Sequence, residues 1–164
     1  MSLLNIIILW VHLFSAVLFV GGSFFMWLVV MPASHLFAKD ESERTQIVGK
    51  IAKEFGRITN PILAILVLTG IYNATWYLPS LGDLLLFKSY GATILFIKVV
   101  LVIILIALVY LHGAYYGRKI VTLARERNIE GLRTVRRSSR LISIANLILM
   151  VAILLLAVIL QMPP

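Results

Sequence analysis

The chain has 164 residues, of which 61% are hydrophobic and 13% charged, and its mean hydropathy is +1.01. Soluble domains average about 45–50% apolar and about 25% charged residues, so this composition predicts an integral membrane protein. The net charge is +8 and cysteine is absent, which excludes disulfides, iron–sulfur clusters and thiolate metal sites.

Four apolar segments predict an all-α fold, an integral membrane four-helix bundle in one domain over residues 1–164. The expected spans are residues 3–31, 58–78, 90–115 and 141–160. The two long connectors, after the first and third spans, are residues 32–57 and 116–140. The first segment lacks a basic start and exceeds the roughly 7–15 apolar residues of a signal peptide. We therefore expect it to be retained as a membrane span.

The first span carries one ionisable side chain, His12, followed by small residues that include Gly22. Small residues let a neighbouring helix or a flat cofactor approach the backbone, and the sequence leaves both open. Beyond this span, apolar residues between 47 and 58 recur at helical spacing. This pattern predicts an amphipathic helix, which Asp40 is positioned to cap.

The second and third spans carry the other polar side chains within the apolar segments. Pro61 is expected to open or kink the second span, and Thr69 and Asn73 follow on one of its faces. In the third span, Lys98 and His112 lie about 21 Å apart on one face, at ~1.5 Å and ~100° per residue. A charged side chain in a bilayer helix costs roughly 3 kcal/mol unless it has a partner or faces water. We therefore expect this face to point into the bundle.

The basic residues predict the orientation of the bundle. The first and third loops carry five and eight Lys and Arg residues, whereas the middle loop has only Lys88 and the tails have none. Positive loops stay in the cytoplasm, so both termini are predicted to be extracytoplasmic. We expect a multi-pass protein of a prokaryotic plasma membrane, with membrane lipid and no nucleic acid as partners.

With this orientation, the sequence predicts two polar layers separated by an apolar middle. His12 and Lys98 share a level in the outer half, close to that of Thr69 and Asn73. The inner boundary gathers a second group of polar residues: His35, Asn60, His112, Ser143 and Asn146.

A histidine inside a bundle is a common axial ligand of haem iron, and it also serves simply to hydrogen-bond helices. Lys98 at the same depth favours haem, because a neutral amine ligates iron and a charged one pairs with a propionate. Acid–base chemistry is a third option. His35 is either a ligand or a contact to lipid head groups. The candidate metal ligands are His12, His35, Lys98 and His112, and the candidate cofactor-binding residues are His12, Gly22, Thr69, Asn73, Lys98 and His112.

Three motifs resemble one known family. They run from Trp10 to Pro32, from Phe55 to Gly70, and from Phe96 to Gly113. This pattern resembles the copper-resistance protein D superfamily, which includes the membrane-embedded, oxygen-independent protoporphyrinogen oxidases. The resemblance covers spans one to three. The fourth span matches in character only, because it lacks the Asn-Glu-x-Pro segment of the oxidases.

The resemblance implies a four-helix bundle that binds haem b, with one haem or two. In the oxidase branch, a first-span histidine and a third-span lysine are tied to haem binding, and these correspond to His12 and Lys98. Copper-resistance members are associated instead with copper uptake. For that function Met26, Met31 and Met150 are far apart in this sequence.

The leading hypothesis is a membrane b-type cytochrome-like redox protein that moves electrons between a hydrophobic donor, a quinol or a porphyrinogen, and a membrane acceptor. An oxidoreductase activity of the protoporphyrinogen oxidase-like or quinone-linked kind is left open. The alternative is a copper or small-solute transport protein of the copper-resistance D type, and a third option is a bundle without a cofactor. The small-molecule partner would be a quinone or a porphyrin, and the sequence leaves a homo-oligomer open.

Overall fold

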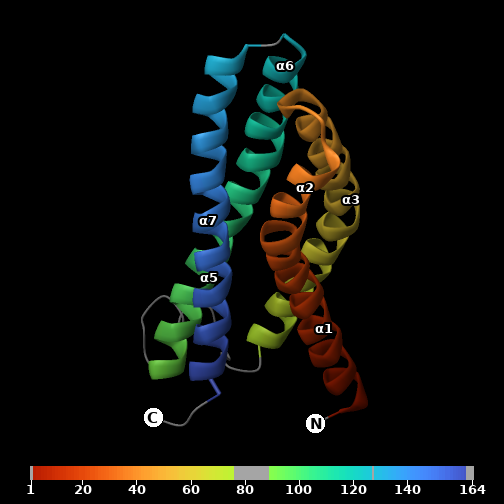
Figure 1. Cartoon of the computed structure of the whole chain (residues 1–164). Helices are drawn as coiled ribbons and strands as arrows, with labels where there is room; N and C mark the ends of the chain where they lie inside the picture. The colour runs from red at the N-terminus through yellow and green to blue at the C-terminus, as the bar shows by residue number, and fades with distance from the viewer. Residues whose placement is uncertain (1, 76–88, 127, 162–164) are drawn as a thin grey trace.

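The structure, a computed structural model, describes residues 2–75, 89–126 and 128–161. Every element in these ranges is helical (Figure 1). In chain order the elements are α1 (Leu3–Phe25), the π-helix η1 (Met26–Val30), α2 (Met31–Phe37), α3 (Glu41–Ala74), α5 (Tyr90–Leu111), the π-helix η2 (His112–Gly117), α6 (Arg118–Arg125) and α7 (Ile129–Ile159).

Four of the resulting helical rods are long and apolar enough to cross a membrane. They cover Leu3–Phe37, Glu41–Ala74, Tyr90–Arg125 and Ile129–Ile159. The prediction of an all-α, four-span membrane protein is therefore confirmed. The last residues of the predicted second span, 76–78, and the loop after it lie outside the described residues.

Polar side chains fix where the helices begin. The Asp40 carboxylate accepts a hydrogen bond from the backbone N–H of Glu43 at 2.7 Å, which confirms the predicted cap of α3. Ser89 caps α5 in the same way, and Asn128 caps α7 through the backbone N–H of Gly131 at 2.9 Å. Each cap satisfies a backbone donor that the first turn of a helix leaves without an intrahelical partner.

The helices extend well beyond the apolar segments. Helix α3 runs for 34 residues, with Pro61 inside it rather than at its start, and joins the amphipathic segment to the second span. Helix α7 likewise begins at Ile129 and includes the basic residues that precede the fourth span. The polar parts of both helices therefore stand on the same rods as the apolar parts, at one end of the bundle.

The rods pack as two pairs, α1 with α3 and α5 with α7. A small core joins the pairs, and each long helix gives it one buried side chain: Phe19, Leu63, Leu105 and Met150. Many large apolar residues on the outer faces are exposed, which is the arrangement expected for contact with lipid.

The chain termini and the basic connectors lie at opposite ends of the bundle. In Figure 1, α1 begins and α7 ends at the lower end, which we call the terminal end. The turns from α2 to α3 and from α6 to α7 lie at the upper end, which we call the connector end. That the terminal end is extracytoplasmic stays a prediction.

Two π-helical segments interrupt the rods, η1 in the first and η2 in the third. Both are continuous with the α-helices on either side, and η2 begins at His112. Insertions of this kind widen a helix by one residue and are frequent at functional sites. No sequence pattern predicted them.

Candidate functional site

The terminal-end layer is organised around His12. Its Nδ1 lies 2.9 Å from Thr69 Oγ1, and that hydroxyl donates to the backbone carbonyl of Ile65 at 2.6 Å. A hydroxyl carries a single proton, so the hydrogen bond between the two side chains needs the proton of His12 Nδ1. We therefore assign His12 as the Nδ1–H tautomer. Its Nε2 then keeps a lone pair that can accept a proton or bind a metal.

Two further residues position the His12 ring. A Cβ atom on Gly70 would lie 3.1 Å from His12 Cε1, so the ring packs directly against the backbone of α3. Lys98 lies close enough to His12 for their charges to interact. The predicted approach of His12 to Thr69 is thus found in the structure, and Lys98 lies within electrostatic range of His12. Their part in binding a cofactor stays a prediction. No sequence pattern predicted the contact between Gly70 and the His12 ring.

Asn73 and Gly22 differ in their surroundings. Asn73 is 8% exposed, and neither polar atom of its amide has a hydrogen-bond partner in the part of the chain that the structure describes. A Cβ atom on Gly22 would lie 2.9 Å from Cε2 of Phe55, so the space over this glycine is filled by a side chain of α3. Close helix packing accounts for Gly22.

A cavity of about 1190 Å³ lies between the four rods. All five residues predicted for the inner polar layer line it: His35, Asn60, His112, Ser143 and Asn146. Both π-helices contribute to its wall, through Met26 to Leu28 of η1 and through His112, Gly113 and Gly117 of η2. Because ligand pockets usually measure about 300–1,000 Å³, this cavity has room for a large ligand.

Two buried polar atoms at the cavity have no partner in the described ranges. They are Nδ1 of His112 and Oδ1 of Asn146, whose residue is 7% exposed. The His112 ring stacks on that of Tyr116 with centroids 6.3 Å apart. A buried polar group without a hydrogen bond costs about 1–3 kcal/mol, so these two atoms favour a bound ligand.

Methionines converge on the same cavity. The three that the structure describes, Met26, Met31 and Met150, all line it. Met26 and Met31 come from the first rod, whereas Met150 comes from α7 and belongs to the core. Sequence separation had concealed this convergence.

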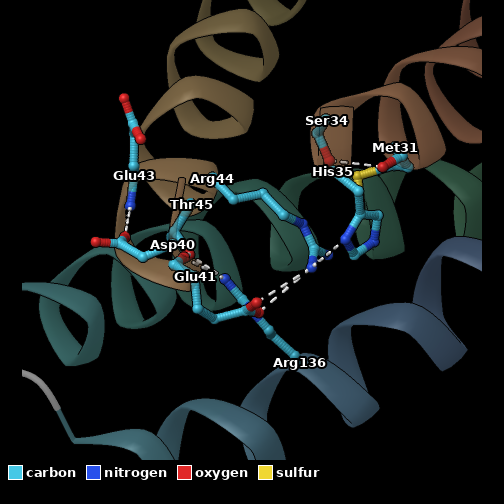
Figure 2. A network of polar contacts seen from close by, with 9 residues as sticks. All are labelled: Met31, Ser34, His35, Asp40, Glu41, Glu43, Arg44, Thr45 and Arg136. Atoms are coloured by element: carbon cyan, nitrogen blue, oxygen red, sulfur yellow. Dashed lines mark hydrogen bonds and ion pairs between the residues drawn. The ribbon is translucent and has the colours of Figure 1, made fainter. Parts of the chain in front are cut away.

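Arginines surround the connector end of the cavity (Figure 2). Glu41 forms ion pairs with Arg136 of α7 and, at 3.3 Å, with Arg44. Arg136 also donates to the hydroxyl of Thr45, and Arg44 Nη1 lies 3.3 Å from His35 Nδ1. This network joins α2, α3 and α7 (Figure 2). In the sequence these charges predicted the topology, and no pattern indicated the network.

The ligand chemistry of the cavity is neutral and soft. No group of three or more His, Cys, Asp or Glu side chains among the described residues could hold a metal ion. The available donors are two imidazoles and three thioethers, with the amides of Asn60 and Asn146 beside them, whereas the Glu41 carboxylate is held in ion pairs with arginines. Thioether and imidazole ligands suit Cu(I), whereas carboxylate and carbonyl ligands suit Mg²⁺, Ca²⁺ and Mn²⁺.

A family model described as copper resistance protein D matches residues 49–160, which is more than half of the chain. The protein belongs to the copper resistance protein D family. Comparisons with curated proteins and with solved structures gave no match. The protein is therefore a multi-pass membrane protein of the copper-resistance type.

The matched range divides the candidate residues of this copper resistance protein D family member. Thr69, Asn73, Lys98 and His112 lie inside it, and so do the arginines of α7. The first-span candidates, with His12 and Gly22 among them, lie before residue 49 and depend on the motifs of the sequence itself.

Proposed function

We propose that this protein handles copper at a membrane, with Cu(I) as its cargo. The observation that carries the proposal is the convergence of Met26, Met31, Met150, His35 and His112 on one cavity. These side chains are neutral or weakly basic donors, which stabilise a soft monovalent cation without requiring a carboxylate. The family match supports the same function.

The two polar layers would give copper two stations along the bundle. At the terminal end, His12 offers Nε2 as a single imidazole ligand, and at the other the cavity offers thioethers and further imidazoles. With the predicted orientation, cargo would pass from the extracytoplasmic layer to the cavity near the cytoplasm. The charge-based topology supports connectors in the cytoplasm, and a prokaryotic plasma membrane is the location that we propose.

Copper binding tests this proposal directly. Purified wild-type protein should bind Cu(I) in competition with a chromophoric Cu(I) chelator. Met26→Leu combined with Met150→Leu should weaken binding by about tenfold or more, because leucine preserves apolar volume and removes sulfur. His12→Gln, at the other layer, is the control for the cavity site and should retain it. Unchanged Cu(I) affinity in the double methionine variant would refute the proposal.

A second candidate is a b-type cytochrome-like protein that passes electrons from a quinol or porphyrinogen to a membrane acceptor. It is favoured by the unpartnered Nδ1 of His112 in a cavity of about 1190 Å³, which fits a haem b group. His112 would hold the iron, and the arginines at the connector end would pair with the propionates. When bound, haem supplies one-electron chemistry, and the chain contributes ligation and burial.

Absorption spectra separate the two candidates. A Soret band with reducible α and β bands in the purified protein supports haem, and His112→Ala should abolish it. His12→Ala tests the other layer: loss of the bands in this variant instead would assign the haem to His12 and Lys98. A colourless protein that binds Cu(I) through its methionines would refute the haem function.

A further inference from the structure

The arginines of α7 form one stripe that faces the cavity. Arg133, Arg136, Arg137 and Arg140 fall within about 100° of one another around the helix axis at ~100° per residue, which places them on one face. All four line the cavity, and they are the only basic residues of α7. The cavity is not enclosed: Arg133, Arg137 and Arg140 are exposed where they line it, and Arg136 is half-buried. Orientation in a membrane requires positive charge on one side of it but does not require four arginines to line one cavity. The stripe therefore calls for another explanation.

Most of this positive charge is unpaired. Arg44 and the stripe give the cavity wall five arginines, against one carboxylate from Glu41. Glu41 pairs with Arg136 and Arg44, and no described residue forms an ion pair with Arg133, Arg137 or Arg140. Like charges three and four residues apart repel one another along a helix. An anion at the stripe would relieve this repulsion.

The face of α7 that lines the cavity changes character along its length. The arginines are followed by Ser143 and Asn146 and then by Leu147 and Met150. The stretch from Arg133 to Met150 is about 26 Å long at ~1.5 Å per residue. A ligand that matches this wall has an anionic group at one end and a long apolar body. This is the chemistry of a membrane lipid.

The cavity also reaches the lipid-facing surface of the bundle. Leu28 of η1 and Tyr110 of α5 both line the cavity and are 57% and 54% exposed. Both residues belong to rods that can cross the membrane. A lipid could therefore enter sideways from the bilayer without crossing water. Basic pockets between membrane helices on the cytoplasmic side are known sites for lipid phosphate groups.

We propose that the cavity binds an anionic phospholipid, with its phosphate at Arg133, Arg137 and Arg140 and its acyl chains along the apolar wall toward Met150. Arginine suits phosphate because its planar guanidinium offers paired donors to two oxygens. This inference goes beyond the copper function and does not rest on it.

Lipid retention tests the proposal on the full-length protein. The protein is incubated in mild detergent with equal amounts of phosphatidylglycerol and phosphatidylcholine carrying the same acyl chains. Retained lipids are then counted by mass spectrometry. The wild type should retain phosphatidylglycerol selectively. Each basic residue near an anionic head group strengthens binding by roughly fivefold. Replacing Arg133, Arg137 and Arg140 together by glutamine should therefore reduce the preference for phosphatidylglycerol on the order of 100-fold.

The matched control removes the same charge from α6, at the same end of the bundle. Arg118, Lys119 and Arg125 do not line the cavity, so their replacement by glutamine should leave the selectivity unchanged. Equal losses in the two triple variants would overturn the proposal in favour of general surface attraction. Absence of any phosphatidylglycerol preference in the wild type would overturn it too, even if the stripe variant failed to fold.

Two further measurements identify the ligand and separate the lipid proposal from the copper proposal. If laurate or haem, which carry carboxylates, were retained through the stripe and phosphatidylglycerol were not, the phospholipid would be the wrong ligand. Met26→Leu with Met150→Leu should lose copper affinity and keep the lipid preference. Failure of the copper proposal would therefore leave the lipid result standing, and failure of the lipid proposal would leave copper binding unaffected.

Discussion

Replacing Gly22 by alanine should destabilise the bundle, although the same change at Gly21 should not. The two glycines are neighbours in α1, and a Cβ atom on Gly21 would have nothing within 4 Å. On Gly22 the added Cβ would lie 2.9 Å from Cε2 of Phe55. Carbon atoms normally approach to about 3.5–4.0 Å, so the ring or the helix must move by roughly 0.6 Å or more.

The two variants differ in a single energetic contribution. Alanine stabilises a helix interior by about 0.5–1 kcal/mol relative to glycine, and both positions gain this. Overpacking against a neighbour costs about 1–3 kcal/mol, which only Gly22→Ala incurs. Gly22→Ala should therefore be less stable than Gly21→Ala by about 1–3 kcal/mol. Phe55→Leu shortens the side chain, so the difference in stability between the two alanine variants should be smaller when both also carry Phe55→Leu.

Reversible unfolding by denaturing detergent in mixed micelles measures these free energies, with helix content as the signal. Gly21→Ala and Gly22→Ala, each with and without Phe55→Leu, are compared under one condition. Equal stability of Gly22→Ala and Gly21→Ala would refute the predicted clash with Phe55. An unchanged difference in the presence of Phe55→Leu would refute it too, because the cost would then not come from the ring.

Three further predictions concern the orientation of the bundle, the Arg136 network and the packing of the His12 ring. A reporter fused to the C-terminus should be active if it requires the periplasm and silent if it requires the cytoplasm, and the reverse result would invert the predicted orientation. Arg136→Gln should lower unfolding free energy by about 1 kcal/mol, because it breaks a half-buried link to α3, whereas Arg133→Gln should not, because no described residue forms an ion pair with Arg133. Gly70→Ala should displace the His12 ring and change its nitrogen NMR shifts, and Gly56→Ala, with nothing within 4 Å, should leave them unchanged.

The resemblance to copper-resistance proteins could be found in the sequence, and so could much of the terminal-end layer. His12 and Lys98 were predicted to share a depth, because charge orients the spans and helix rise converts position into depth. Their proximity and the hydrogen bond to Thr69 agree with that argument. Gly70 was missed, because a need for close approach is visible only when the opposing side chain is known.

The sequence by itself determined the number of membrane spans, their apolar character and the Asp40 cap. These are local properties: an apolar run of sufficient length cannot satisfy its backbone in lipid except as a helix, and Asp40 acts within its own turn. The tertiary structure alone decided that Met26, Met31 and Met150 line one cavity, and that the stripe on α7 lines the same cavity. The physical reason is that the helical period shows which residues share one face of a helix, but it does not show which neighbour that face contacts. The rotation of each rod is set by packing against the others, through contacts such as Phe55 on Gly22.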